Sequence, residues 1–328
     1  MMWIVLIGLG AGITSALLFA AVATGQPFAI ALFYLTPLPI LLAGIAWNHL
    51  AGAVAAATAA AILGAFLGYW MVLAFLIAIG LPTYTLAYLA MLARPSGNGS
   101  GGQLEWYPVG RLVLAAALIA ATATALSIPA FGVDAESYRA GLRAAFERVL
   151  RAQTATPSGE PLVLPGVRDT KATLEVLAIV MPPAAACFSM ITLLANLWLA
   201  GRVARMSGRL ARPWPDIGAM RFPNGAPILL AVMIAGTFVP GLVGLVSSFF
   251  AATLLLAYAI LGFAILHGAT RAISARLVIL ICAWVAVLML GWPIFVVAIL
   301  GLADTFIDLR GRLGKGGPPD LSPHQPDK

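Results

Sequence analysis

The chain begins with MMWIVLIGLGAGITSALLFAAVATGQPFAIALFYLTPLPILLAGIAW (residues 1–47) and contains no Asp, Glu, Lys or Arg before Arg94. A helix that crosses the hydrocarbon layer of a bilayer needs about 20 mostly apolar residues, because that layer is roughly 30 Å thick. The first 93 residues therefore hold about four spans. We predict two of these at 2–24 and 28–47, and two more within 50–93, separated by a turn near 68–70.

The composition of the whole chain indicates the same class of protein. Of its 328 residues, 62% are hydrophobic and 9% are charged, whereas an ordinary soluble domain has about 25% charged residues. One soluble core could not bury so much apolar surface, so lipid must solvate most of it. The net charge of +7 comes from basic residues in the short connections, as membrane topology requires, and we expect no nucleic-acid partner. We predict an all-α, polytopic transmembrane helix bundle whose main partner is the lipid bilayer.

Further apolar runs follow the first four. They lie at 110–130, at 173–200, twice within 226–270 on either side of Pro240, and at 277–303 with a break near Gly291. We predict eight to ten spans in a single transmembrane domain that covers residues 1–312. The tail at 313–328 is polar and rich in Gly and Pro, and we expect it to be disordered.

The hydrophilic segment at 131–172 contains an amphipathic helix from about Asp134 to Gln153. Tyr138, Leu142 and Phe146 fall on one face of this helix, and arginines line the other. Asp134 is a suitable N-cap, since its carboxylate can accept hydrogen bonds from the first free backbone amides. Two placements stay open: the helix lies on the membrane surface, or it packs against the protein's own ends.

The basic residues indicate which side each connection faces. If every apolar run crosses the membrane, the connections at 94–111, 201–225 and 271–276 share one side and together hold nine Arg. The segment at 131–172 faces the other side and holds six basic residues, nearly cancelled by acids. Cytoplasmic connections are enriched in Lys and Arg. We therefore predict both termini in the cytoplasm, 131–172 in the periplasm, and a hairpin at 291–293 that favours ten spans.

Catalytic motifs are missing from the sequence. It has no HExxH, no phosphate-binding P-loop, no GxSxG and no cluster of His, Cys and carboxylates. We therefore expect no enzyme activity, no cofactor, and no catalytic, cofactor-binding or metal-binding residues.

Thr36, Pro37 and Pro39 interrupt the second apolar run near its middle. Proline lacks a backbone donor and so leaves a carbonyl group free, and transporters use such helix breaks at their binding sites. Two hypotheses stay open: these residues border a ligand site, or they form a kink around which neighbouring helices pack.

Two polar residues lie within later apolar runs. Asn196 can form a hydrogen bond between helices or contact a ligand. Asp304 lies near the end of the last run, where an ionised side chain must turn toward protein because lipid cannot solvate it. Its neighbours Asp308 and Arg312 favour an anchoring role at the interface over proton or ion coupling.

A basic run follows the span at 173–200. It consists of Arg202, Arg205, Arg209 and Arg212, accompanied by one acid, Asp216. Each basic residue beside an anionic membrane surface contributes about 1 kcal/mol. We predict that these four arginines bind lipid headgroups; the alternative partner is a nucleic acid or a cytoplasmic protein.

Small residues are dense between Gly52 and Gly64, with Ala51, Ala55 and Ala59 at helical spacing. Small side chains let two helices approach closely. This face could receive a membrane protein partner, or it could pack against other helices of the same chain.

Two stretches carry a family resemblance: LTPLPILLAG (35–44) and ILGLADTFIDLR (299–310). They resemble the YybS-like family of bacterial membrane proteins, domain of unknown function 2232, and the overall pattern covers residues 1–312. The resemblance implies residence in the bacterial inner (cytoplasmic) membrane and little about chemistry. The first four spans are also similar to the substrate-binding membrane subunits of energy-coupling-factor vitamin transporters, but this chain is longer and no vitamin-binding motif maps onto it.

These observations favour one function and leave an alternative. We expect recognition or transport of a small molecule, with or without an energising partner. The alternative is a scaffold that organises other membrane proteins without transporting anything. Copurification with a nucleotide-hydrolysing complex would favour the first, and copurification with non-transport proteins the second.

Overall fold

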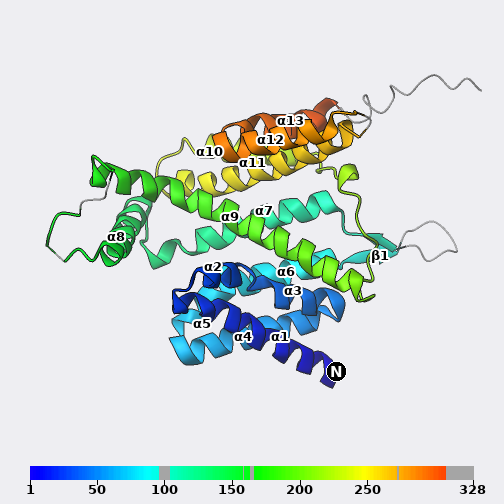
Figure 1. Cartoon of the computed structure of the whole chain (residues 1–328), viewed down its shortest axis with the longest axis horizontal. Helices are drawn as coiled ribbons and strands as arrows, with labels where there is room; N and C mark the ends of the chain where they lie inside the picture. The colour runs from blue at the N-terminus through cyan, green and yellow to red at the C-terminus, as the bar shows by residue number, and fades with distance from the viewer. Residues whose placement is uncertain (96–103, 158, 163–165, 272, 308–328) are drawn as a thin grey trace, which may run out of the picture.

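The computed structural model describes residues 1–95, 104–157, 159–162, 166–271 and 273–307 (Figure 1). The glycine-rich run near 96–102 and the tail at 313–328 lie outside the described residues, as do Asp308, Arg310 and Arg312. The described chain is mostly helical and has only two short strands, so the predicted all-α class is confirmed.

The first quarter of the chain forms the four spans that its uncharged sequence predicts. Its elements are α1 (Met2–Ala20), η1 (Ala21–Thr24), α2 (Pro27–Tyr34), α3 (Pro37–Ala46), α4 (His49–Leu67), α5 (Trp70–Phe75), η2 (Leu76–Gly80) and α6 (Leu81–Ala90). The chain turns between α4 and α5 at Gly68, whose φ of +98° is a conformation that side chains with a Cβ rarely adopt. The turn predicted at this position is therefore confirmed.

The rest of the chain alternates long helices with short connections. Its elements are β1 (Ala93–Pro95), β2 (Leu104–Trp106), α7 (Val109–Leu126), η3 (Ile128–Ala130), α8 (Ala135–Thr154), α9 (Thr170–Met206), η4 (Ile217–Ala219), α10 (Ala226–Gly236), α11 (Leu242–Ala269), α12 (Arg276–Leu290) and α13 (Pro293–Ile307). The two short strands were not predicted. They pair antiparallel, and Arg94 and Glu105 face each other with an ion pair of 2.8 Å.

Within the described residues, seven helical segments are long and apolar enough to cross a membrane, and three shorter apolar helices, α10, α12 and α13, accompany them. The breaks predicted near Pro240 and Gly291 account for the shorter helices. With a rise of 1.5 Å per residue, α12 and α13 are each about 22 Å long, less than the hydrocarbon thickness. The predicted eight to ten spans therefore include helices that are too short to cross alone.

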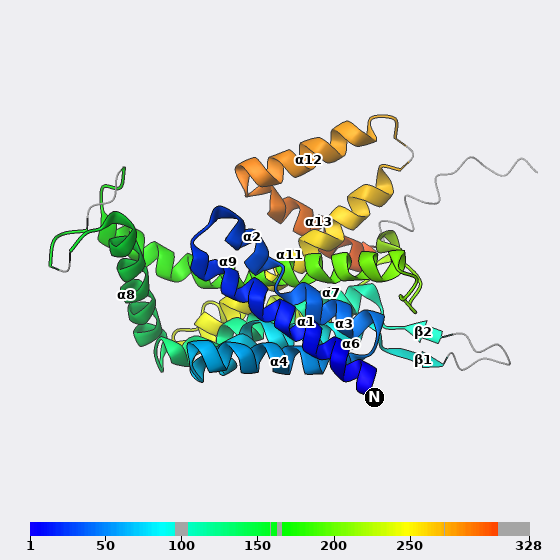
Figure 2. The ribbon, with the colours of Figure 1, turned by 60° about the horizontal axis from the view of Figure 1, so that its bottom comes forward.

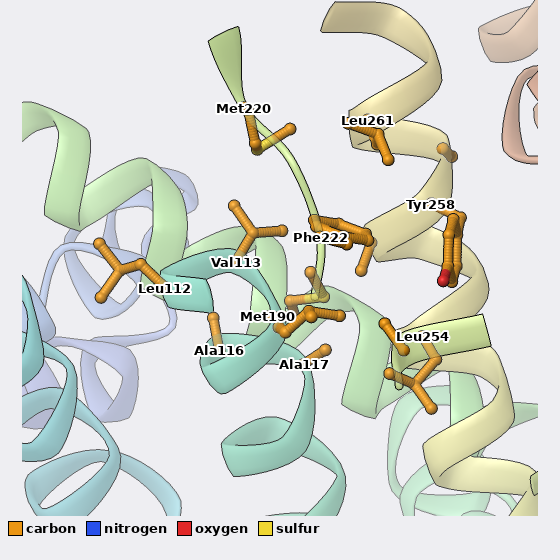
Figure 3. Close-up of a cluster of buried hydrophobic side chains, with 14 of the residues drawn as sticks. Leu112, Val113, Ala116, Ala117, Met190, Met220, Phe222, Leu254, Tyr258 and Leu261 are labelled. Atoms are coloured by element: carbon orange, nitrogen blue, oxygen red, sulfur yellow. The ribbon is translucent and has the colours of Figure 1, made fainter. Parts of the chain in front are cut away.

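Three long helices, α7, α9 and α11, pack together in the bundle, with α1–α6 on one side of them and α10, α12 and α13 on the other (Figure 1). Figure 3 shows the apolar core where they meet, with Met190 of α9, Ala117 of α7 and Leu254 of α11 in one cluster. Helices α11 and α13 approach especially closely. A Cβ on Gly262 would lie 1.9 Å from the Val297 carbonyl oxygen, so only glycine fits there.

The face of α4 that carries Ala51, Ala55 and Ala59 is completely buried within the chain. It packs against α1, where Cβ atoms on Gly8 and Gly12 would lie within 3 Å of α4 atoms. The small residues therefore serve close packing of this chain's own helices, and this face is not exposed to a partner.

Helix α8 follows the sequence prediction closely. Asp134 caps it by accepting from the backbone amides of Glu136 and Ser137, and Ser137 bonds back to the Asp134 amide. Tyr138 and Leu142 are buried against the bundle, whereas Val149 is exposed. Figure 2 shows α8 lying across the end of α9. The first half of α8 thus packs against the protein's own end. This is the second of the two placements that the sequence left open.

The two ends of the bundle carry different connections. Helix α8 lies at one end, and β1, β2 and the C-terminal end of α9 lie at the other (Figures 1 and 2). The structure therefore separates 131–172 from the arginine-rich connections, which is the arrangement that the charge count predicts.

Candidate functional site

A large apolar cavity lies between α7, α9, α11 and α12, at the arginine-rich end of the bundle. Its volume is about 930 Å³, within the roughly 300–1,000 Å³ range typical of ligand pockets. Among the residues that line it in the described part of the chain, Arg212 is the only charged one. The cavity is therefore suited to an apolar molecule or to the apolar part of a larger one.

Aromatic side chains from four segments of the chain line this cavity. Trp198 comes from α9, Trp214 from the connection after α9, and Phe263 and Trp284 from α11 and α12. Phe263 and Trp284 stack nearly parallel, with ring centroids 4.1 Å apart. This stack joins α12 to α11 and closes one wall of the cavity.

Arginines stand beside the lining tryptophans. The guanidinium carbon of Arg202 lies 5.8 Å from the Trp198 ring and 5.9 Å from the Trp214 ring, and that of Arg205 lies 5.3 Å from Trp214. These distances are typical of cation–π contacts. Both arginines are exposed, so their charges lie at an edge of the cavity. Arg209 makes a similar contact with Trp47, at 4.8 Å.

Arg212 differs from the other three arginines of the basic run. Its Nη1 donates to the Ala90 carbonyl oxygen at 2.9 Å, and its Nη2 donates to that of Tyr107 at 2.8 Å. These bonds tie the connection after α9 to the end of α6 and to the start of α7. Burial lowers the pKa of Arg212, but an arginine stays protonated at neutral pH because its ordinary pKa lies far above neutrality. Headgroup binding by any of the four arginines stays a prediction.

The helix break at Thr36, Pro37 and Pro39 is held by neighbouring helices. Ser15 of α1 donates its hydroxyl to the Thr36 carbonyl oxygen at 2.8 Å. Asn196 of α9 donates Nδ2 to the Tyr34 carbonyl oxygen at 2.8 Å. The two carbonyl groups beside the break are thus paired inside the bundle, as membrane-embedded backbone requires.

The break does not line the cavity. Thr36 Oγ1 and Asn196 Oδ1 are nevertheless buried without a hydrogen-bond partner among the described residues. A buried polar atom without a partner is costly. A polar ligand or a water molecule could supply these partners, and a ligand role for Thr36, Pro37, Pro39 and Asn196 stays a prediction.

Asp304 lies on α13 and is only 6% exposed. Helix α13 packs along α11, so this carboxylate turns toward protein rather than lipid, as the cost of an ionised group in lipid requires. Whether it anchors the helix end stays a prediction. Its expected neighbours Asp308 and Arg312 lie outside the described residues.

The sequence did not predict this cavity, because the residues that line it lie as far apart in the chain as Ile45 and Ile294. One local signal could have indicated it. Trp198 and Trp214 enclose the basic run, and aromatic residues interleaved with arginine are typical of a membrane interface or a binding surface.

Comparison with known proteins gives a family and no further relatives. No curated protein and no solved structure matches the chain. A family model described as predicted membrane protein, DUF2232, matches residues 12–305. This range includes the helix break, the basic run, the cavity and Asp304. It covers most of the chain and confirms the resemblance inferred from 35–44 and 299–310. The chain therefore belongs to the DUF2232 family of predicted membrane proteins.

Proposed function

We propose that this protein recognises or transports a small molecule that it binds in the apolar cavity. The supporting observation is the cavity itself, which has a volume of about 930 Å³ and is lined by residues of α7, α9, α11 and α12. Membrane helices without a ligand would be expected to pack side by side and fill such a space, since empty volume forfeits dispersion contacts. A cavity of this size is therefore a site that a ligand can stabilise.

The proposed setting is the bacterial inner membrane, with the cavity near the cytoplasmic face. The arginine-rich connections lie at the cavity end of the bundle and α8 lies at the other (Figure 1). Because basic connections prefer the cytoplasm, this orientation puts Arg202 and Arg205 at the cytoplasmic membrane surface.

A cavity-filling substitution tests the proposal. Ala195 lines the cavity and is exposed, so a phenylalanine there should occupy ligand space without overpacking the core. Ala184 lies three turns earlier on α9, is also exposed, and is not among the lining residues. Ala184→Phe is therefore a matched control.

The full chain should be purified from native membranes with each substitution, and the bound small molecules identified by mass spectrometry. The wild-type protein and Ala184→Phe should carry the same ligand, and Ala195→Phe should lose it. Equal ligand content in all three proteins would rule out binding in this cavity and would favour the scaffold alternative.

A further inference from the structure

We infer that the occupant of the cavity is a lipid with a phosphate-bearing, anionic headgroup, bound as a discrete ligand and not as bulk bilayer. Its apolar chains lie in the cavity, and its phosphate lies at the guanidinium groups of Arg202 and Arg205. This inference rests on the proposed function and names the chemical class of its ligand.

The lining selects an apolar ligand body. Except for Arg212, every lining residue in the described part of the chain is glycine, proline, aliphatic, methionine or aromatic. Arg212 already donates from both terminal nitrogens to the Ala90 and Tyr107 carbonyl oxygens. A polar solute would give up its hydrogen bonds to water and find few replacements, which is unfavourable. Hydrocarbon chains have no hydrogen bonds to give up when they enter.

The edge of the cavity selects a negative headgroup. Arg202 and Arg205 form no ion pair with any carboxylate among the described residues. Asp216 is the only acid between Glu175 and Asp304 in the sequence, and it lies 3.7 Å from Arg271. The positive charge beside the cavity is therefore not compensated locally.

The tryptophans help to make these arginines a phosphate site. The Trp214 ring lies within 6 Å of both guanidinium carbons, and the Trp198 ring lies within 6 Å of that of Arg202. Stacking on aromatic rings restricts the side chains, so less conformational entropy is lost when an anion binds. Arginine presents several donors in a planar fork that matches the oxygens of a phosphate group.

Helix α12 provides a route from the bilayer. It is described in full and none of its residues is buried, although Trp284 and Leu288 line the cavity. Figure 2 shows α12 standing off from α9, and the Phe263–Trp284 stack joins it to α11. The outer wall of the cavity is thus a single helix that faces lipid on its other side. A lipid can enter between α9 and α12 without passing through water.

Lipid titration of the delipidated full chain in detergent, followed by native mass spectrometry, tests the inference. The probes are dioleoyl phosphatidylglycerol, dioleoyl phosphatidylcholine and glycerol phosphate, which has the anionic group but no chains. Wild-type protein should bind one phosphatidylglycerol more tightly than phosphatidylcholine, and glycerol phosphate far more weakly. The double variant Arg202→Gln/Arg205→Gln should weaken phosphatidylglycerol binding by about fivefold for each arginine removed.

The control removes two exposed arginines at the opposite end, with Arg139→Gln/Arg148→Gln on α8, and should leave the affinity unchanged. Equal binding of both phospholipids, wild-type affinity in Arg202→Gln/Arg205→Gln, or tight binding of glycerol phosphate would overturn the inference.

A second experiment fills the cavity. Ala195→Phe should block lipid binding; if that variant folds poorly, Leu288→Trp on the exposed helix α12 takes its place. If a cavity-filling variant loses lipid binding but Arg202→Gln/Arg205→Gln does not, the proposed function stands and the lipid inference fails. If neither cavity-filling variant loses binding, the proposed function and the lipid inference both fail.

Discussion

Asn196 on α9 donates its Nδ2 to the backbone carbonyl oxygen of Tyr34, 162 residues earlier, at 2.8 Å. The acceptor is the last residue of α2, beside the break that precedes Pro37. Asn196 is 4% exposed, so this bond lies inside the bundle and replaces a helical partner that the break removes. It connects the N-terminal four-span unit to the central helix.

We predict that Asn196→Leu destabilises the protein by about 1–2 kcal/mol, because it leaves a buried carbonyl group without this donor. The measurement is the midpoint of thermal unfolding in detergent. Thr14→Val is the control, since Thr14 bonds only to the Gly10 carbonyl oxygen of its own helix and is exposed. An unchanged midpoint for Asn196→Leu would show that the bond contributes nothing.

We predict that Gly262→Ala and Gly301→Ala each lower stability. Their Cβ atoms would lie 1.9 Å from the Val297 carbonyl oxygen and 2.2 Å from that of Tyr258, so α11 and α13 would have to separate. Gly268→Ala on the same helix α11 meets nothing within 4 Å. It should be neutral or stabilising, by up to about 1 kcal/mol from helix propensity. Equal unfolding midpoints for all three variants would contradict this packing.

Reporter fusions test the orientation. A reporter fused after Gln153, in α8, and one fused after Arg221 should report opposite sides of the membrane, with Arg221 in the cytoplasm. The expectation follows from the positions of these segments at opposite ends of the bundle (Figure 1). Identical readings from both fusions would disprove the predicted topology.

Two substitutions separate charge from shape at Asp304. If the carboxylate anchors the end of α13, Asp304→Leu should lower the folded yield more than Asp304→Asn, because Asn keeps the shape and most of the hydrogen-bonding capacity. Folded yield is measured as the monodisperse fraction after purification. Full yield and unchanged thermal stability for Asp304→Leu would show that the charge anchors nothing.

The sequence by itself determined what depends on neighbouring residues and on the solvent. The uncharged first 93 residues required four spans, since only lipid can solvate them. Asp134 was sufficient to place the start of α8, because a cap bonds only to the next few amides. The Pro-Gly pair at 240–241 and the Gly-Trp-Pro run at 291–293 likewise indicated where the last apolar runs divide.

Only the tertiary structure decided which surfaces meet. The apolar cavity, the Asn196–Tyr34 bond and the closeness of Gly262 to Val297 join residues that are far apart in the sequence. In an all-apolar helix, the residues that face lipid and those that face protein have similar composition, so periodicity does not distinguish them. The faces are chosen by shape complementarity between helices, and that complementarity exists only once the helices have packed.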